Sequence, residues 1–147
     1  KKFAVAGDPD YLLGIVSFLL EMGAIPYHVL CSRTTKKFEK EMKALLATSP
    51  FGATGKVYIN KDLWHLRSLL MTDPVDGIIG DTHAKWAARD AGIPLFRIGF
   101  PIIDRVNLHR SPVVGYQGAV NMLSMIANKF IDIKDETCEN QWFEMMR

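Results

Sequence analysis

The sequence predicts an α/β fold, a Rossmann-like three-layer sandwich with a parallel sheet of about five strands and helices on both faces. Two observations predict it. Short apolar segments alternate along the chain with segments of helical periodicity, and turn residues such as Gly, Pro and Asp separate most of them. Strands that alternate with helices form βαβ units, whose strands are parallel. The chain has 147 residues, 48% of them apolar, which is sufficient for one hydrophobic core.

Two strand–helix units are predicted in the first third of the chain. An apolar strand at residues 3–6 leads through a Gly-Asp-Pro-Asp turn into a helix at 10–22. A second strand at 26–31 precedes a helix at 32–48, because apolar residues recur there on one stripe at helical spacing. The stripe comprises Phe38, Met42, Leu45 and Leu46.

The same alternation continues to the end of the chain. The expected elements are a strand at 56–59, a helix at 62–71, a strand at 75–80, a short helix at 83–90, a strand at 93–98 and a final helix at 116–131. The predicted domain covers residues 1–133, and residues 134–147 form a C-terminal tail. Because the sequence starts directly on a strand, we interpret it as one domain of a longer polypeptide.

Composition excludes several classes of partner. The formal net charge is only +2, and the basic residues are interleaved with acids, which argues against nucleic-acid binding. The chain has 2 cysteines, Cys31 and Cys138, at no metal or redox spacing, which is typical of a reducing, cytoplasmic compartment. No apolar run approaches the roughly 20 residues that a membrane helix needs.

The turn after the first strand occupies the place where a dinucleotide-binding fold carries its phosphate loop. The motif G-x-G-x-x-G is absent, and the carboxylates of Asp8 and Asp10 would repel a pyrophosphate. Asp8 is suited to cap the following helix, and Pro9 is suited to its first turn. We therefore interpret this segment as a capped turn and predict no nucleotide site.

No catalytic, cofactor-binding or metal-ligating residue is predicted. The 4 histidines, His28, His65, His83 and His109, include no pair at a ligand spacing such as His-x-x-x-His. No G-x-S-x-G elbow indicates a hydrolase.

One helix carries a face that is typical of a protein interface. The core stripe of helix 62–71 comprises leucines, and Trp64, His65 and Arg67 lie off that stripe. Trp and Arg are the residues that most often anchor protein–protein contacts. The alternative for Trp64 is an ordinary core position.

The loop after the last strand has an unusual density of charge. It contains Asp104, Arg105, His109 and Arg110, and it follows a Gly-Phe-Pro break at the carboxyl edge of the sheet. In open α/β sheets this edge is where ligands and partners bind. Two interpretations stand side by side: Asp104 pairs with an arginine to fix the shape of the loop, or the charged loop faces another domain or subunit.

Three segments also resemble a known family. Residues 7–14 read GDPDYLLG, residues 57–70 read VYINKDLWHLRSLL, and residues 97–119 read RIGFPIIDRVNLHRSPVVGYQGA. In this order they resemble the C-terminal domain of the β subunit of nitrogenase component 1, the molybdenum-iron type of dinitrogenase. The resemblance extends from residue 3 to residue 131, and the apolar, arginine-terminated ending at 142–147 is similar to that of the family.

The resemblance implies a function for the whole protein and a supporting role for this chain. Component 1 is an α2β2 tetramer that takes part in the ATP-dependent reduction of dinitrogen to ammonia. It receives electrons from an iron protein and passes them through an iron-sulfur P-cluster to a metal-sulfur cofactor of molybdenum, vanadium or iron-only type. The β cysteines that hold the P-cluster lie in a part of the subunit that this chain does not include. No cluster or cofactor is therefore expected in the chain, and its expected partners are the α subunit and the second β subunit.

Two positions differ from related sequences. In α-type subunits a histidine that ligates the cofactor stands roughly ten residues before the G-Y-x-G motif, and here Arg105 stands there. A guanidinium has no lone pair for a metal, so the loop resembles the β type. Where many family members read I-G-N-S-Y-G-K, this chain reads IGDTHAK at 79–85. The difference leaves the vanadium-type and iron-only-type β chains open, as well as the second subunit of the cofactor-assembly scaffold. A free-standing Rossmann-like binding domain is a further alternative, since fold alone does not determine function.

Overall fold

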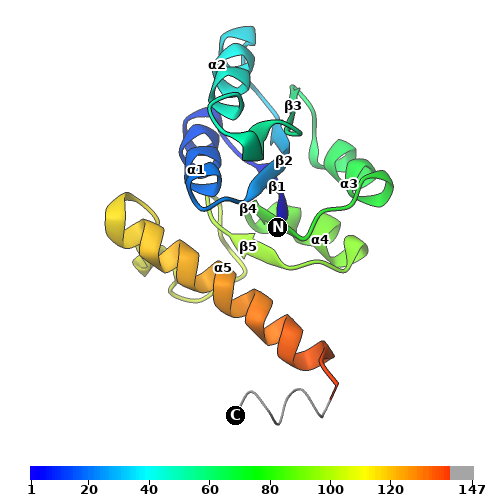
Figure 1. Cartoon of the computed structure of the whole chain (residues 1–147), viewed down its shortest axis with the longest axis vertical. Coiled ribbons are helices and arrows are strands. Elements are labelled where there is room, and N and C mark those ends of the chain that lie inside the picture. The colour runs from blue at the N-terminus through cyan, green and yellow to red at the C-terminus, as the bar shows by residue number, and fades with distance from the viewer. Residues whose placement is uncertain (140–147) are drawn as a thin grey trace. The chain divides into compact units, whose positions relative to one another are not determined.

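The computed structural model describes residues 1–139 and confirms the α/β fold class (Figure 1). One sheet with the strand order β3-β2-β1-β4-β5 forms the centre of the first of two compact units, Lys1–Val106 and Asn107–Arg147. Each neighbouring pair of strands is parallel. The strands are β1 (Lys2–Ala6), β2 (Ile25–Cys31), β3 (Lys56–Ile59), β4 (Gly77–Gly80) and β5 (Leu95–Arg97).

Helices cover both faces of this sheet, as the sequence predicts. On one face lie α1 (Pro9–Glu21) and α2 (Lys36–Leu46), and on the other lie α3 (Leu63–Thr72) and α4 (Lys85–Ala91) (Figure 1). The chain runs from β1 outward to β3 and then returns to β4, on the other side of β1. The carboxyl ends of β1 and β4 are therefore neighbours at the point where the strand order reverses.

The core follows the apolar patterns of the strands and helices. The predicted stripe of α2 is confirmed in part, since Phe38, Met42 and Leu46 are buried. Leu66 and Leu70 of α3 pack with Ala87 and Ala88 of α4 and with Ile78 of β4. Burial of such side chains stabilises the fold by roughly 1.5–3 kcal/mol for each large aliphatic residue.

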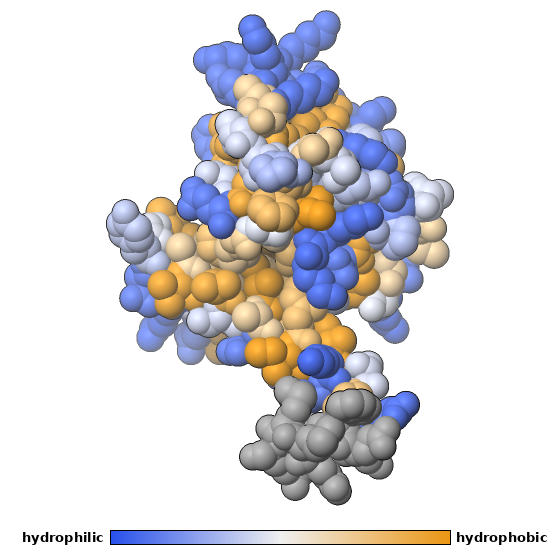
Figure 2. Space-filling view, viewed as in Figure 1, coloured by the Kyte–Doolittle hydropathy of each residue, from blue (hydrophilic) through white to orange (hydrophobic). Residues whose placement is uncertain are grey.

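The outer surface of α2 is solvated. Two of its lysines form ion pairs within the helix, Lys43 with Glu39 and Lys37 with Glu41. Figure 2 shows hydrophilic side chains at the end of the molecule where Figure 1 places α2. None of the helices in the described residues is long and apolar enough to cross a membrane.

The second unit contains a short 3-10 helix, η3 (Leu108–Arg110), and the long helix α5 (Gly115–Thr137). The predicted helix at 116–131 was too short at its C-terminal end. Residues 132–137 continue it, since they include no Gly or Pro and contain Lys134 and Glu136, whose side chains favour a helix. The expected boundary between 133 and 134 falls inside α5, and residues 140–147 of the expected tail lie outside the described part of the chain.

Smaller differences concern the ends of elements. The helix expected at 32–48 begins only at Lys36, since Thr35 is extended and occupies its N-cap position. Strands β4 and β5 are shorter than the predicted strands at 75–80 and 93–98. The remaining residues of these apolar runs form the connections that lead into and out of the strands. Apolar periodicity does not distinguish such connecting residues from strand residues.

Candidate functional site

An apolar groove lies on the outer surface of α3 and α4. Its volume is about 490 Å³, and its lining includes Trp64 of α3 and Trp86 of α4 together with Leu63, Arg67, His83, Ala87 and Asp90. The side chain of Trp64 is 72% exposed and that of Trp86 is 59% exposed. Trp64 therefore does not occupy a core position. We name this surface the two-tryptophan groove.

The first turn of α3 orients Trp64 and Arg67. Asp62 caps the helix, and its carboxylate accepts a hydrogen bond of 2.9 Å from the backbone N–H of His65. The Arg67 guanidinium lies over the Trp64 ring, 5.6 Å from its centroid, and forms an ion pair with Asp90 near the end of α4. The salt bridge thus joins α3 to α4 at the groove, and the cation stacks on the indole within α3.

His65 lies apart from the groove. Its ring contacts the ring of Tyr58 on β3 edge-on, with centroids 5.4 Å apart, and its Nε2 is buried without a hydrogen-bond partner among the described residues. Tyr58 in turn contacts the fully buried His28, whose Nε2 donates to the backbone oxygen of Asp73 at 2.9 Å. Burial lowers the pKa of His28, so a neutral ring is favoured. His65 thus faces the sheet.

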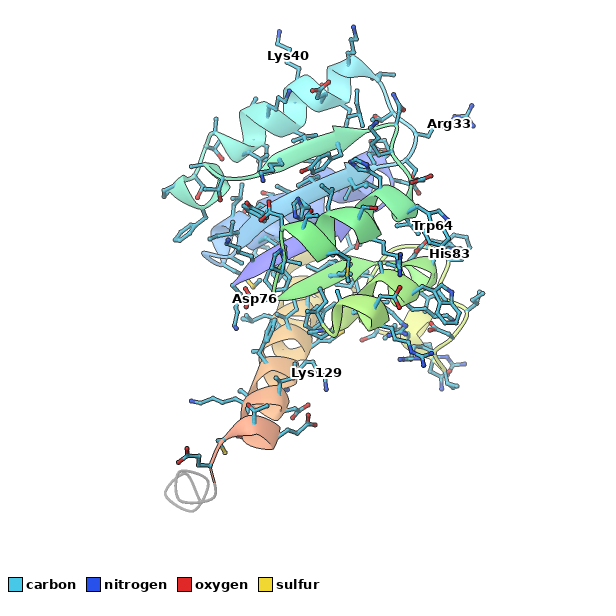
Figure 3. All side chains as sticks on the ribbon, turned by 90° about the vertical axis from the view of Figure 1, so that its right-hand side faces the viewer. Arg33, Lys40, Trp64, Asp76, His83 and Lys129 are labelled. Carbon is cyan, nitrogen blue, oxygen red and sulfur yellow. The ribbon has the colours of Figure 1, made fainter. Side chains whose placement is uncertain are left out.

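A 3-10 turn, η2 (Thr82–Ala84), connects the groove with the loop after β5. Asp81 caps η2, and its carboxylate accepts from the backbone N–H of His83 at 2.9 Å and contacts His83 Nδ1 at 3.0 Å. Figure 3 shows His83 near Trp64, and both residues line the groove. Thr82, one residue earlier, is buried and bonds to the loop.

Asp104 anchors the loop to the end of the sheet. Its carboxylate accepts hydrogen bonds from Arg97 Nη2 at 2.8 Å and Nε at 2.9 Å, and from the Thr82 hydroxyl at 2.9 Å. The Thr82 oxygen also accepts from the backbone N–H of Ile103 at 3.0 Å. Both partners of the ion pair are mostly buried, with 13% of the Arg97 side chain and 20% of the Asp104 side chain exposed. This is the salt-bridged loop of the first interpretation.

The Asp104 pair makes stability depend on pH. Hydrogen bonds from Arg97 lower the pKa of Asp104 from 3.8 to about 2. A depressed carboxyl pKa stabilises the folded state fully above the unfolded value, and that stability is lost as the pH falls from about 4 toward 2. We expect Asp104→Asn to lower the free energy of unfolding at neutral pH and to flatten its slope between pH 4 and 2. Urea unfolding across this range measures the slope.

Asp90→Asn is the matched control for this prediction. It removes the partner of Arg67, but both side chains are exposed by more than a third, and such surface pairs contribute little. An unchanged slope for Asp104→Asn, or an equal loss for both variants, would contradict the anchoring role of Asp104.

The anchored loop exposes large apolar side chains that sequence reasoning missed. The exposed fractions are 87% for Phe100, 77% for Ile103 and 91% for Val106. Their regular spacing of three residues, at positions 100, 103 and 106, is the sequence signal that could have identified them. Several large apolar side chains exposed on one short loop are typical of a contact surface. We name these three residues the apolar loop face.

The other three residues that the sequence analysis singled out in this loop, Arg105, His109 and Arg110, are divided between the two units. Arg105 is exposed, and its guanidinium reaches the backbone oxygen of Asp104 at 2.6 Å and its carboxylate at 3.5 Å. Arg110 is exposed on η3 in the second unit. His109 is also in η3, and its side chain lies outside the described part. The first unit therefore presents two candidate contact surfaces, the two-tryptophan groove and the apolar loop face.

The side chain of Tyr11 fills the crevice at the carboxyl end of β1. The ring of Tyr11 covers Gly7, where a Cβ would lie 2.7 Å from Tyr11 Cδ1, and it lies 3.6 Å from the Cβ position of Gly99. Asp8 is the N-cap residue of α1 as predicted, with Pro9 in the first turn, although its side chain makes no capping bond. A side chain thus occupies the place where a nucleotide would lie in a dinucleotide-binding fold.

The described residues do not fit a metal cluster. They include no group of three His, Cys, Asp or Glu side chains that could hold a metal ion. Cys31 is buried at the end of β2, where desolvation raises the pKa of its thiol, and thiolate is the form that binds metals. Arg105 offers no lone pair.

Comparisons with known proteins now decide the family. The family model of nitrogenase component 1 type oxidoreductases matches residues 1–131. The chain belongs to this family. The resemblance of the three sequence motifs to nitrogenase component 1 is thereby confirmed.

Individual relatives agree with this assignment. The chain is 53% identical over 137 residues to the nitrogenase molybdenum-iron protein beta chain of Nostoc sp., covering 93% of this chain and 27% of that protein. It is 48% identical over 143 residues to the beta chain of the same name from Azotobacter vinelandii, covering 92% and 27%. A solved structure of nitrogenase Cp1 at pH 6.5 superposes with a TM-score of 0.90 at 36% identity, covering 96% of this chain and 31% of that chain.

The chain spans about a quarter of the length of these curated relatives. The departure at residues 79–85 does not separate it from the molybdenum-iron beta chains, since identity to them exceeds half in several organisms. His83, which belongs to this departing segment, lines the two-tryptophan groove.

Proposed function

We propose that the chain is the C-terminal Rossmann-like domain of a cytoplasmic β subunit of nitrogenase component 1 of the molybdenum-iron type. The observation that carries this proposal is the 53% identity to a molybdenum-iron protein beta chain over 93% of the chain. In the whole complex the subunit takes part in the ATP-dependent reduction of dinitrogen to ammonia. Its partners are the α subunit and a second β subunit in an α2β2 tetramer, and the iron protein supplies electrons.

Within that complex the domain has a structural role. Trp64 and Arg67 of the groove, together with the loop that carries Arg105, His109 and Arg110, contact neighbouring domains or subunits. Asp104 holds the part of the loop that belongs to the first unit in place through Arg97 and Thr82. The exposed fractions of the apolar loop face support such contacts, because three large apolar side chains exposed on one short loop are typical of a contact surface. His65 supports α3 from the sheet side through Tyr58.

The P-cluster and the metal-sulfur cofactor belong to the rest of the complex. We therefore expect the isolated chain, purified without oxygen, to contain no stoichiometric iron and no iron-sulfur absorbance. The described residues include no set of ligands for a metal ion, and the thiol of Cys31 is buried and protonated. Iron analysis together with the visible spectrum checks this. One or more iron atoms per chain would contradict it.

A chimeric subunit tests the proposed function. This chain replaces the matching quarter of the Nostoc sp. beta chain, which is expressed with its own α chain and cofactor-assembly machinery. We expect a complex of the same mass as the parent and reduction of ¹⁵N-dinitrogen to ammonia at a rate within about tenfold, or 1.4 kcal/mol of activation free energy, of the parent. A complex that fails to form, or that forms without reducing dinitrogen, would overturn the proposal.

A further inference from the structure

The two-tryptophan groove has the features of a contact centre and lacks those of a small-molecule site. Its polar side chains are already paired with one another or with neighbours, Arg67 with Asp90 and His83 with Asp81. Few hydrogen-bonding groups remain to orient a polar ligand, which small-molecule pockets require. Two exposed indoles beside an arginine are instead the composition that is enriched at the centres of protein–protein contacts.

The electrostatics of the groove indicate the sign of its partner. The ammonium group of Lys85 lies 4.9 Å from the centroid of the Trp86 ring. Among the described residues no carboxylate lies within ion-pair distance of Lys85, whereas Arg67 is neutralised by Asp90. One positive charge therefore remains beside an apolar surface, and a carboxylate on the partner would complement it.

We propose that the two-tryptophan groove docks a segment of another polypeptide within the component 1 assembly. This segment inserts one large apolar side chain between Trp64 and Trp86 and places an aspartate or glutamate against Lys85. The groove, with a volume of about 490 Å³, has room for one large apolar side chain. Lys85 lies over the indole of Trp86, which lines the groove. The carboxylate and the apolar residue of the partner segment are therefore expected within about four residues of each other in its sequence.

Photo-crosslinking in the assembled complex tests this inference, which rests on the proposed function for the identity of the assembly. In the chimera, p-benzoylphenylalanine replaces Trp64, and in a second preparation it replaces Trp86. Both side chains are largely exposed, so neither substitution disturbs the core. After irradiation, mass spectrometry identifies the crosslinked peptide. We expect both positions to label the same segment, at or beside a large apolar residue with Asp or Glu within four positions.

Lys85→Gln and Lys85→Arg provide the matched pair of variants. We expect Gln to reduce the yield of the adduct at least about tenfold, because the acidic segment loses its cation, while Arg retains it. The inference is overturned if no adduct forms, if the labelled segment has no acidic residue, or if Lys85→Gln leaves the yield unchanged. A complex that reduces dinitrogen but gives no adduct overturns this inference alone. A complex that assembles and gives the adduct but does not reduce dinitrogen overturns only the proposed function.

Discussion

Alanine at Gly118 is expected to destabilise the start of α5 by about 1–3 kcal/mol or more. A Cβ at this position would lie 2.3 Å from the backbone carbon of Val113 and 2.9 Å from its Cα. Because the obstacle is backbone, no side-chain rotation relieves it, and the segment before the helix has to move. The same segment is fastened to α5 by a hydrogen bond of 3.0 Å from Asn121 Nδ2 to the Pro112 oxygen. Urea unfolding followed by circular dichroism measures the loss.

Gly14→Ala is the control for this substitution. Gly14 lies in the middle of α1, and nothing lies within 4 Å of its Cβ position. Alanine there is expected to stabilise the chain by about 0.5–1 kcal/mol, because glycine loses more backbone entropy in a helix. If Gly118→Ala were as stable as the unsubstituted chain, the close approach of the two backbone segments would not exist in solution. The second glycine of the G-Y-Q-G motif would then need another explanation.

Aspartate at Ile103 is expected to abolish assembly of the full-length complex while leaving the isolated chain folded. Ile103 is 77% exposed, so the substitution changes the stability of the chain by no more than about 0.5 kcal/mol. In a buried contact the same carboxylate would lack a partner, which costs several kcal/mol and weakens association at least a hundredfold. Native mass spectrometry of the chimera and thermal unfolding of the isolated chain measure the two effects separately.

Ile103→Leu serves as the conservative counterpart, because it keeps the volume and apolar character of the side chain. It is expected to assemble like the parent. Normal assembly of Ile103→Asp would show that the apolar loop face remains in water within the complex. Equal failure of both variants would indicate that the loop tolerates no change of shape, and the role of its apolar character would be refuted.

Local patterns were sufficient for most of the fold. The leucines of α3 predicted a helix at 62–71, and the structure places it at Leu63–Thr72, one residue later at each end. The alternation of strands and helices predicted the parallel sheet in the same way. Such features depend on residues that are neighbours in the sequence, and a single chain therefore contains the information.

The candidate site depends on contacts that local patterns do not contain. Trp64 stood out by its residue type, but its neighbour Trp86 was missed because α3 and α4 are separated by β4 in the sequence. Asp104 was considered both as an anchor and as a contact residue. Only the positions of Arg97 and Thr82 show that it is turned inward, which leaves Phe100 and its apolar neighbours as the outer surface.

Hydroxyl-radical footprinting tests the central claim, that the exposed surfaces of this domain are contacts in a larger assembly. The isolated chain and the assembled chimera are oxidised under the same conditions, and the rates at Phe100, Ile103 and Trp64 are compared. Phe38, which is buried, provides the lower limit of the rate. We expect rapid oxidation of Phe100, Ile103 and Trp64 in the isolated chain and at least about tenfold slower oxidation in the complex. Equal rates in the two states would contradict it.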